Sequence, residues 1–155
     1  YKFIWRLMKK REKGFTLIEL LVVVAIIGAL AAVGVVAYNG YTAAAKKNAA
    51  KSIHSGAVKY IAAEMAKCVV DDSDTILGSV ACPGTGGTIA DAYVDLSQDK
   101  NPWSTSNDAA SKVASKPDTV AKGNLYLIVT EDAPNDIEIL MSDGDSEFTT
   151  TLSVE

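Results

Sequence analysis

Glu19 is the residue near the N-terminus whose type and position most need a chemical explanation. It is the one acid between residues 15 and 45, and it lies in the stretch KGFTLIELLVVVAIIG of residues 13–28. A carboxylate in lipid is costly, so intramembrane acids usually meet a partner or a polar path. The alternative is that Glu19, being close to the helix end, reaches the membrane interface. Its position predicts either an acid that lies at the membrane interface or one that pairs with another group.

Two cysteines, Cys68 and Cys82, are the next candidates for chemistry. They are too few for a disulfide scaffold, and no CxxC or Cys/His cluster indicates zinc. Outside the reducing cytoplasm the two would form one structural disulfide, worth about 3 kcal/mol in the chain-entropy model for a loop of this size. The alternative is two buried free thiols.

Other chemical signals in the sequence are weak. Asp143, Asp145 and Glu147 surround Gly144 and are weak candidates for calcium, but the spacing is not that of an EF-hand, which favours a solvated acidic turn. The single histidine, His54, is expected to be a surface or packing residue. Neither a Ser/His/Asp arrangement nor a phosphate-binding or dinucleotide motif is present, so we expect no catalysis and no cofactor.

Charge is divided unevenly along the 155-residue chain. The whole chain carries a formal net charge of −4, but residues 1–14 hold six basic residues and one acid. The remainder therefore holds nine basic and eighteen acidic residues, a net charge of −9. An acidic domain of this kind argues against a nucleic-acid surface, which is normally basic, and is typical of a soluble domain facing water.

The elements that would position these residues begin with one long helix. Residues 15–38 are apolar apart from Glu19, and residues 15–42 are predicted to form a transmembrane or filament-core helix. The charge-free residues 20–45 would form a helix of about 39 Å, long enough for a bilayer core of about 30 Å. No breaker separates them from residues 43–68, where apolar residues recur at helical spacing. That stripe consists of Ala50, Ile53, Ala57, Tyr60, Ile61 and Met65.

The remainder of the chain is predicted to complete a small α+β head. Residues 69–122 are rich in turn-forming residues and are expected to be mainly loop, with a short helix or strand at 89–96 and Trp103 packed inward. In residues 123–155, three segments have strand character: 124–130, 137–142 and 148–154. We expect an antiparallel sheet of three or four strands covered by the amphipathic half of the long helix.

The segment of residues 9–45 resembles the N-terminus of type IV prepilins and the related pseudopilins of type II secretion. The resemblance rests on a short basic leader, the Gly14–Phe15 junction, Glu19 and the long apolar helix. A generic membrane anchor has no reason to combine these features. Outside this segment the chain resembles the family only in its layout, a long helix packed on an antiparallel sheet.

The resemblance implies a specific processing and assembly route. A membrane prepilin peptidase would cut after Gly14 and methylate the new terminal amine of Phe15. Glu19 would then pair with the Phe15 amine of a neighbouring subunit, so that its partner does not exist before the cut. Residues 1–14 would be the leader, and a start at Met8 would give the short leader MKKREKG.

Two departures from familiar pilins are visible. Val36 stands where many pilins have a proline, leaving Gly28 and Gly34 as the residues that would weaken this helix in a filament. The cysteines also lie at the predicted helix exit rather than near the C-terminus. Tyr38 and Tyr41 end the apolar run, which suits a membrane interface or packing between subunits.

The resemblance therefore implies a structural, major pilin-like subunit of a type IV pilus, serving adhesion, twitching motility or DNA uptake. It would be inserted in the bacterial inner membrane with its leader in the cytoplasm, and would join the assembly machinery to form an extracellular homopolymer. Direct nucleic-acid binding is not supported. The alternatives are a major pseudopilin of type II secretion and a membrane-anchored binding domain that never polymerises.

Overall fold

The computed structural model describes residues 14–70 and 75–154. The predictions for residues 1–13, including the basic leader and a start at Met8, lie outside the described residues. The chain divides into two compact units, one ending at Tyr41 and the other beginning at Thr42. The first consists, where described, of the junction at residues 14–16 and the first part of helix α1.

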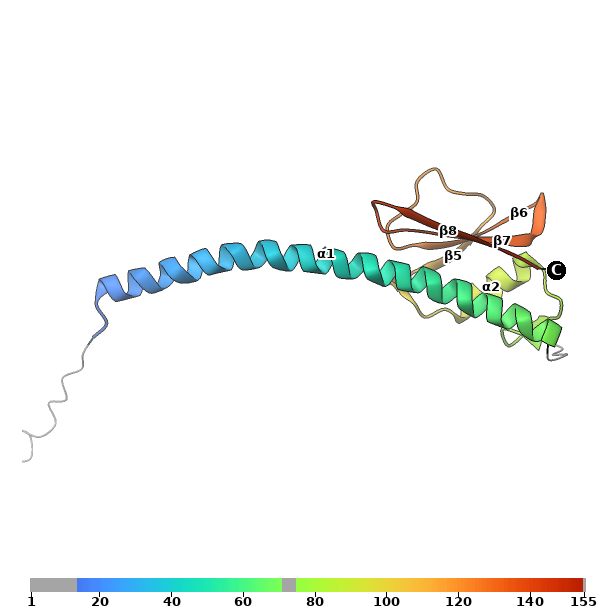
Figure 1. Cartoon of the computed structure of the whole chain (residues 1–155), viewed down its shortest axis with the longest axis horizontal. Helices are drawn as coiled ribbons and strands as arrows, with labels where there is room; N and C mark the ends of the chain where they lie inside the picture. Colours follow the sequence, from blue (N-terminus) through green and yellow to red (C-terminus); the bar gives the residue numbers. More distant parts are fainter. Residues whose placement is uncertain (1–13, 71–74, 155) are drawn as a thin grey trace, which may run out of the picture. The chain divides into compact units, whose positions relative to one another are not determined.

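Helix α1 runs without interruption from Leu17 to Val70, a length of 54 residues (Figure 1). Alanine, leucine and lysine favour helix throughout this range, and no proline occurs in it. This agrees with the prediction of one long helix. The described residues contain one helix long and apolar enough to cross a membrane, judged by length and composition only.

Where the structure describes it, the second unit combines the remainder of α1 with a second helix and eight strands. Helix α2 (Gly86–Leu96) begins at a capping box, in which Thr85 and Thr88 each accept a hydrogen bond from the other's backbone N–H. The first strands are β1 (Thr75–Ile76), β2 (Val80–Ala81), β3 (Lys100–Asn101) and β4 (Ser104–Asp108). The remaining strands are β5 (Ala110–Val113), β6 (Leu125–Thr130), β7 (Ala133–Ser142) and β8 (Glu147–Ser153).

The main sheet has the strand order β5-β6-β7-β8 (Figure 1). Strands β6, β7 and β8 form the predicted antiparallel meander. Strand β5 adds a fourth, but it pairs with β6 in parallel, so the expectation of a purely antiparallel sheet is wrong at this edge. The physical reason is that residues 114–124 form a long connection instead of a tight turn, and parallel neighbours need such a connection.

The core of the head lies between the sheet and α1. Ile61 on the helix and Leu127, Ile137 and Ile139 on the sheet are completely buried in one apolar cluster, which also includes Ile89 of α2. Alternation along β7 places its buried Ile137 and Ile139 on the face that meets the helix. The α+β fold predicted from the sequence is therefore confirmed.

Two details of the predicted head need correction. The expected loop at residues 69–122 contains α2 and strands β1–β5, because short Gly- and Thr-rich segments still make capped helices and two-stranded ladders. Tyr60, predicted as part of the apolar stripe, is 45% exposed, whereas Glu64, an acid, is buried. The stripe is thus narrower than the apolar residues suggest.

Candidate functional site

The junction between Gly14 and Phe15 lies before the helix and is open to solvent. Residues 14–16 have no regular secondary structure, and Phe15 is 89% exposed. A Cβ added to Gly14 would meet no heavy atom within 4 Å. Packing within the chain therefore does not require glycine here, and the peptide bond is sterically accessible.

Glu19 has a hydrogen-bonding role inside the first unit. The backbone N–H and the hydroxyl of Thr16 both donate to Oε2 of Glu19, at 2.8 and 2.7 Å, and the N–H of Glu19 donates to the Thr16 hydroxyl at 3.3 Å. This is a capping box at the start of α1. The expectation that Glu19 waits without any partner until the chain is cut is corrected in this respect.

The sequence pattern of this capping box is a signal that the sequence-based prediction missed. Threonine followed three residues later by glutamate, directly before an apolar run, is the pattern of a helix N-terminus. Both hydrogen bonds from Thr16 go to Oε2, and within the described residues none is formed to Oε1. Glu19 can therefore cap its own helix and still offer one oxygen to another group.

The first half of α1 presents apolar side chains on all sides. Between Leu17 and Val36 the large apolar residues are 48–81% exposed, and the most apolar 18-residue window has a mean hydropathy of 3.0 with no buried residue. A helix that is apolar all round must be covered by lipid or by other helices. Tyr38 and Tyr41, at its end, are 68% and 75% exposed.

Gly28 and Gly34 lie within the continuous helix and touch nothing in this subunit. A Cβ at either position would have no heavy atom within 4 Å. Neither close packing nor an unusual backbone angle therefore explains these glycines. Their predicted role in weakening the helix within a filament stays a prediction.

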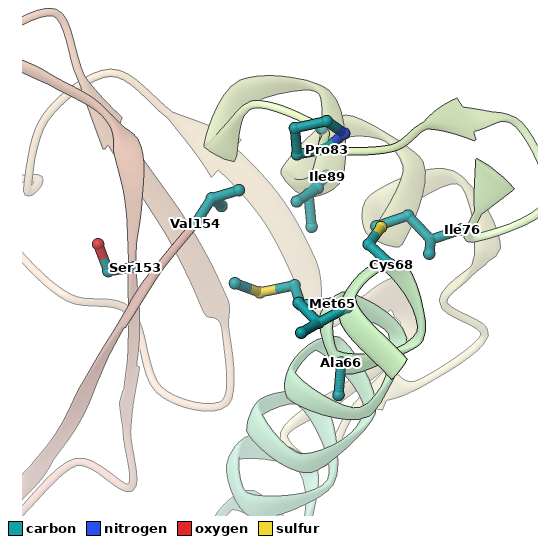
Figure 2. A pocket seen from close by; sticks show the side chains of 10 residues that line it. Met65, Ala66, Cys68, Ile76, Pro83, Ile89, Ser153 and Val154 are labelled. Carbon is teal, nitrogen blue, oxygen red and sulfur yellow. The ribbon is translucent and has the colours of Figure 1, made fainter. Parts of the chain in front are cut away.

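The two cysteines form the predicted disulfide. Cys68, at the end of α1, is bonded to Cys82, with a Cα–Cα distance of 5.6 Å. The bond closes the segment that contains β1 and β2. Beside it lies an apolar pocket of about 220 Å³. Its lining includes Met65 of α1 and Val154, the residue that follows β8 (Figure 2).

Glu64 is a buried acid that the sequence analysis did not identify. One carboxylate oxygen accepts a hydrogen bond from Lys67, and the other accepts the backbone N–H of Leu77 at 3.0 Å. Hydrogen bonding to Lys67 and then to Leu77 lowers the pKa of Glu64. Leu77 has a φ of 49°, in the left-handed region, so this contact helps to hold an unusual turn. The signal was available, because position 64 follows Ile61 by three residues on the same helical face.

The three acids considered for calcium make separate contacts. Oδ1 of Asp143 accepts two backbone N–H groups, at 2.9 and 2.8 Å, which lower its pKa. Asp145 pairs with Lys47, and Glu147 pairs with a lysine of the β5–β6 connection. Among the described residues no group of three or more His, Cys, Asp or Glu is arranged to hold a metal ion.

The remaining singled-out residues have structural contacts. Nε2 of His54 donates to the carbonyl oxygen of Ile139 at 3.0 Å, which fits the predicted packing role. Oδ1 of Asn101 accepts the backbone N–H groups of Trp103 and Ser104, at 2.7 and 3.2 Å, and Trp103 packs against the core.

The structure is that of an α+β head preceded by a long apolar helix. No part of the first unit, where it is described, covers the apolar side chains of that helix. Residues 9–35 match the family described as the prokaryotic N-terminal methylation motif. This match includes Gly14, Phe15 and Glu19.

Curated relatives match about half of the chain. A fimbrial protein of Dichelobacter nodosus is 43% identical over 81 residues, which are 51% of each chain. A type IV major fimbrial protein FimA of the same organism is 44% identical over 75 residues, 47% of each chain. A fimbrial protein of Moraxella nonliquefaciens is 41% identical over 71 residues, 44% of this chain and 46% of the relative.

The chain spans about half the length of the curated relatives it matches. No solved structure matches it significantly. The chain therefore carries the prokaryotic N-terminal methylation motif at residues 9–35, and about half of it is similar to type IV fimbrial proteins.

Proposed function

We propose that this chain is a subunit of a type IV pilus, made as a membrane-inserted prepilin and polymerised through the first half of α1. The observation that carries the proposal is the combination of the methylation motif at residues 9–35 with a helix whose apolar side chains are exposed on every side. Neighbouring copies of the same helix would cover that surface after the chain leaves the lipid.

The processing step begins at the open junction. A prepilin peptidase would cut the bond between Gly14 and Phe15 and N-methylate the new terminus. The amine created on Phe15 has an ordinary pKa near 8 and keeps its charge when methylated. An apolar filament core would strengthen its attraction to a carboxylate relative to water.

Glu19 would supply that carboxylate without giving up its cap. Thr16 occupies Oε2, while Oε1 would accept the Phe15 amine of the neighbouring subunit. Pairing every acid with an amine would fix the register of one subunit on the next. Assembly would thus add a second contact to a residue that is already ordered.

The topology follows from the charges. Basic residues beside a membrane span favour the cytoplasmic side, so the leader would stay in the cytoplasm and the head would face the periplasm. The Cys68–Cys82 disulfide fits that oxidising compartment. The pilus would serve adhesion, twitching motility or DNA uptake, and the fimbrial relatives favour a pilus over a type II pseudopilus.

Three substitutions separate the cap from the contact between subunits. Glu19→Gln keeps hydrogen-bond acceptors for Thr16 but removes the charge, whereas Thr16→Ala removes the side-chain cap and keeps the charge. We expect filaments seen by electron microscopy to be lost with Glu19→Gln and with Glu19→Ala, and to persist with Thr16→Ala. Normal filament numbers with Glu19→Gln would overturn the proposed ion pair.

The cleavage proposal has its own measurement. Mass spectrometry of filament protein should show a chain that begins at methylated Phe15. A filament subunit that retains Met8 would contradict processing at Gly14. Prepilin processing should remain intact in both Glu19 variants, because the cut precedes the pairing.

A further inference from the structure

A second pocket in the head lies between α1 and the C-terminal end of α2. It has a volume of about 310 Å³, at the lower end of the range for small-ligand sites. Tyr60 of α1 and Tyr93 of α2 contribute to its walls, with Leu96, Ser97 and Asp99. All belong to the second unit. The filament function proposed above does not use this pocket.

The aromatic part of the pocket offers ring surfaces. The rings of Tyr60 and Tyr93 lie with their centroids 6.1 Å apart and their planes tilted by 52°. Tyr93 is 5% exposed and forms the closed side, whereas Tyr60 is 45% exposed and accessible. The faces of aromatic rings carry partial negative charge and attract organic cations.

The polar part of the pocket is negative. Asp99 is the one charged residue in its lining, and the last turn of α2 carries no basic residue. The C-terminus of a helix has partial negative charge from its unpaired carbonyl groups. Burial raises the pKa of Tyr93 and the Asp99 carboxylate raises it further, so the field of Asp99 reaches the tyrosine hydroxyl.

A buried serine oxygen lies in the same lining. Hydrogen bonding from the Ser97 hydroxyl partly opposes the rise in the pKa of Tyr93, so the hydroxyl proton is directed toward the tyrosine. Among the described residues, no group donates a hydrogen bond to Oγ of Ser97, which is buried. Buried polar atoms normally have partners, and a hydroxyl oxygen can accept a proton from a bound donor.

We propose that this pocket binds a primary ammonium group, as carried by a lysine side chain or a polyamine. Ring faces, a carboxylate, a helix C-terminus and a hydroxyl oxygen able to accept a hydrogen bond all favour a compact cation with several N–H donors. The same features disfavour anions. All residues that line the pocket belong to one subunit, so binding does not depend on filament assembly.

The first experiment titrates the full chain in detergent micelles with n-butylammonium, and with 1-butanol as a neutral control of similar size. Labelling with 3-fluorotyrosine lets ¹⁹F NMR follow each tyrosine separately. We expect a saturable shift of the Tyr60 and Tyr93 signals with the amine and none with the alcohol. No saturable shift, or an equal response to 1-butanol, would overturn the proposal.

Substitutions test the groups that carry it. Asp99→Asn and Tyr60→Leu should each weaken amine binding about two- to fivefold, the range for one exposed charge or one ring face. Asp132→Asn, an exposed acid in the β6–β7 turn, is the matched charge control and should leave binding unchanged. An equal loss with Asp132→Asn would show that only net charge matters.

A third variant blocks the pocket without altering its charge. A Cβ at Gly56, which also lines the pocket, would meet nothing within 4 Å, so Gly56→Phe can project its ring into the space. It should abolish the saturable shift while the head keeps its thermal unfolding temperature. Unchanged amine binding in this variant would place the amine elsewhere and overturn the site.

The source of the ammonium group can be distinguished with assembled filaments, a comparison that rests on the proposed function. If a lysine of a second copy fills the pocket, filaments should lose the response to n-butylammonium that detergent-solubilised subunits show. If a free amine is the ligand, both should respond. Loss of all filaments would leave the titration in detergent as an independent test.

Discussion

The two units of this molecule use apolar residues in opposite ways. In the first unit, the apolar residues from Leu17 to Val36 form a helix with every large side chain exposed. In the second, Ile61 of the helix and Ile137 and Ile139 of strand β7 are completely buried. The comparison shows that large apolar side chains are buried where their own unit offers a partner surface, and are exposed where it offers none.

The largest expected effect sharpens this contrast with two isoleucines of the same helix. Ile61→Ala removes a completely buried side chain and should lower the free energy of unfolding of the head by about 2–5 kcal/mol. Ile27→Ala changes a residue that is 59% exposed and should leave it unaltered. Urea unfolding in micelles, followed by the fluorescence of Trp103 in a chain that begins at Phe15, measures both. Equal losses would refute the separation into two units.

The second expected effect concerns the cross-link at the end of α1. Replacing Cys68 and Cys82 by serine should lower the free energy of unfolding of the head by about 3 kcal/mol. Since the first unit contains no cysteine, membrane insertion should not change. Reduction of the wild-type protein in the same urea titration provides the matched control, and no shift of the midpoint on reduction would contradict the prediction.

The third effect compares glycines from the two regions and predicts opposite signs. Gly123 has a φ of +74°, and a Cβ there would come within 2.4 Å of Oδ1 of Asn101, which the N–H of Trp103 holds in place. Gly123→Ala should therefore lower the free energy of unfolding by about 1–3 kcal/mol.

Gly34→Ala should instead stabilise helix α1 locally, by up to about 1 kcal/mol, because glycine is a poor helix former and nothing lies within 4 Å of the new methyl group. Hydrogen exchange of the amides around residue 34 measures this gain. Faster exchange in Gly34→Ala would show that this glycine has a packing role.

Some elements of the fold could be predicted from the sequence and others could not. The long helix and the three strands of the meander were predictable because hydrophobic periodicity is a local signal. The disulfide was predictable because the chain has only two cysteines to pair. The parallel pairing of β5 was not, since residues 110–113 acquire their partner from a long-range contact. Strand pairing of short polar segments depends on context that a single sequence does not contain.

The candidate site shows a different limit. The roles of Gly14, Phe15 and Glu19 stay predictions that rest on the combination of these residues. The hydrogen bonds between Thr16 and Glu19 were missed, although the capping pattern was present. Glu64 was missed because acids are seldom buried, and its partner Leu77 lies thirteen residues further along. A turn formed after the helix ends cannot be deduced from helical periodicity.

The smallest expected effect tests that buried acid through pH. Hydrogen bonds from Lys67 and from the N–H of Leu77 lower the pKa of Glu64 in the folded head below its ordinary value of 4.5. Because the folded state binds this proton less readily than the unfolded state, Glu64 stabilises the head above about pH 4.5, and the contribution disappears as the pH falls through the lower folded-state value.

Glu64→Gln isolates this contribution from other acids with lowered pKa values. Asp143 titrates in the same direction but is present in both proteins, so its effect cancels in the difference. The wild type should exceed Glu64→Gln in free energy of unfolding by about 1 kcal/mol at pH 7, and the gap should close toward pH 3. Glutamine still accepts the Leu77 N–H, so what is lost is the charge that attracts Lys67. A gap that widens on acidification would mean that the buried acid is protonated in the folded head, and that burial outweighs its two hydrogen bonds.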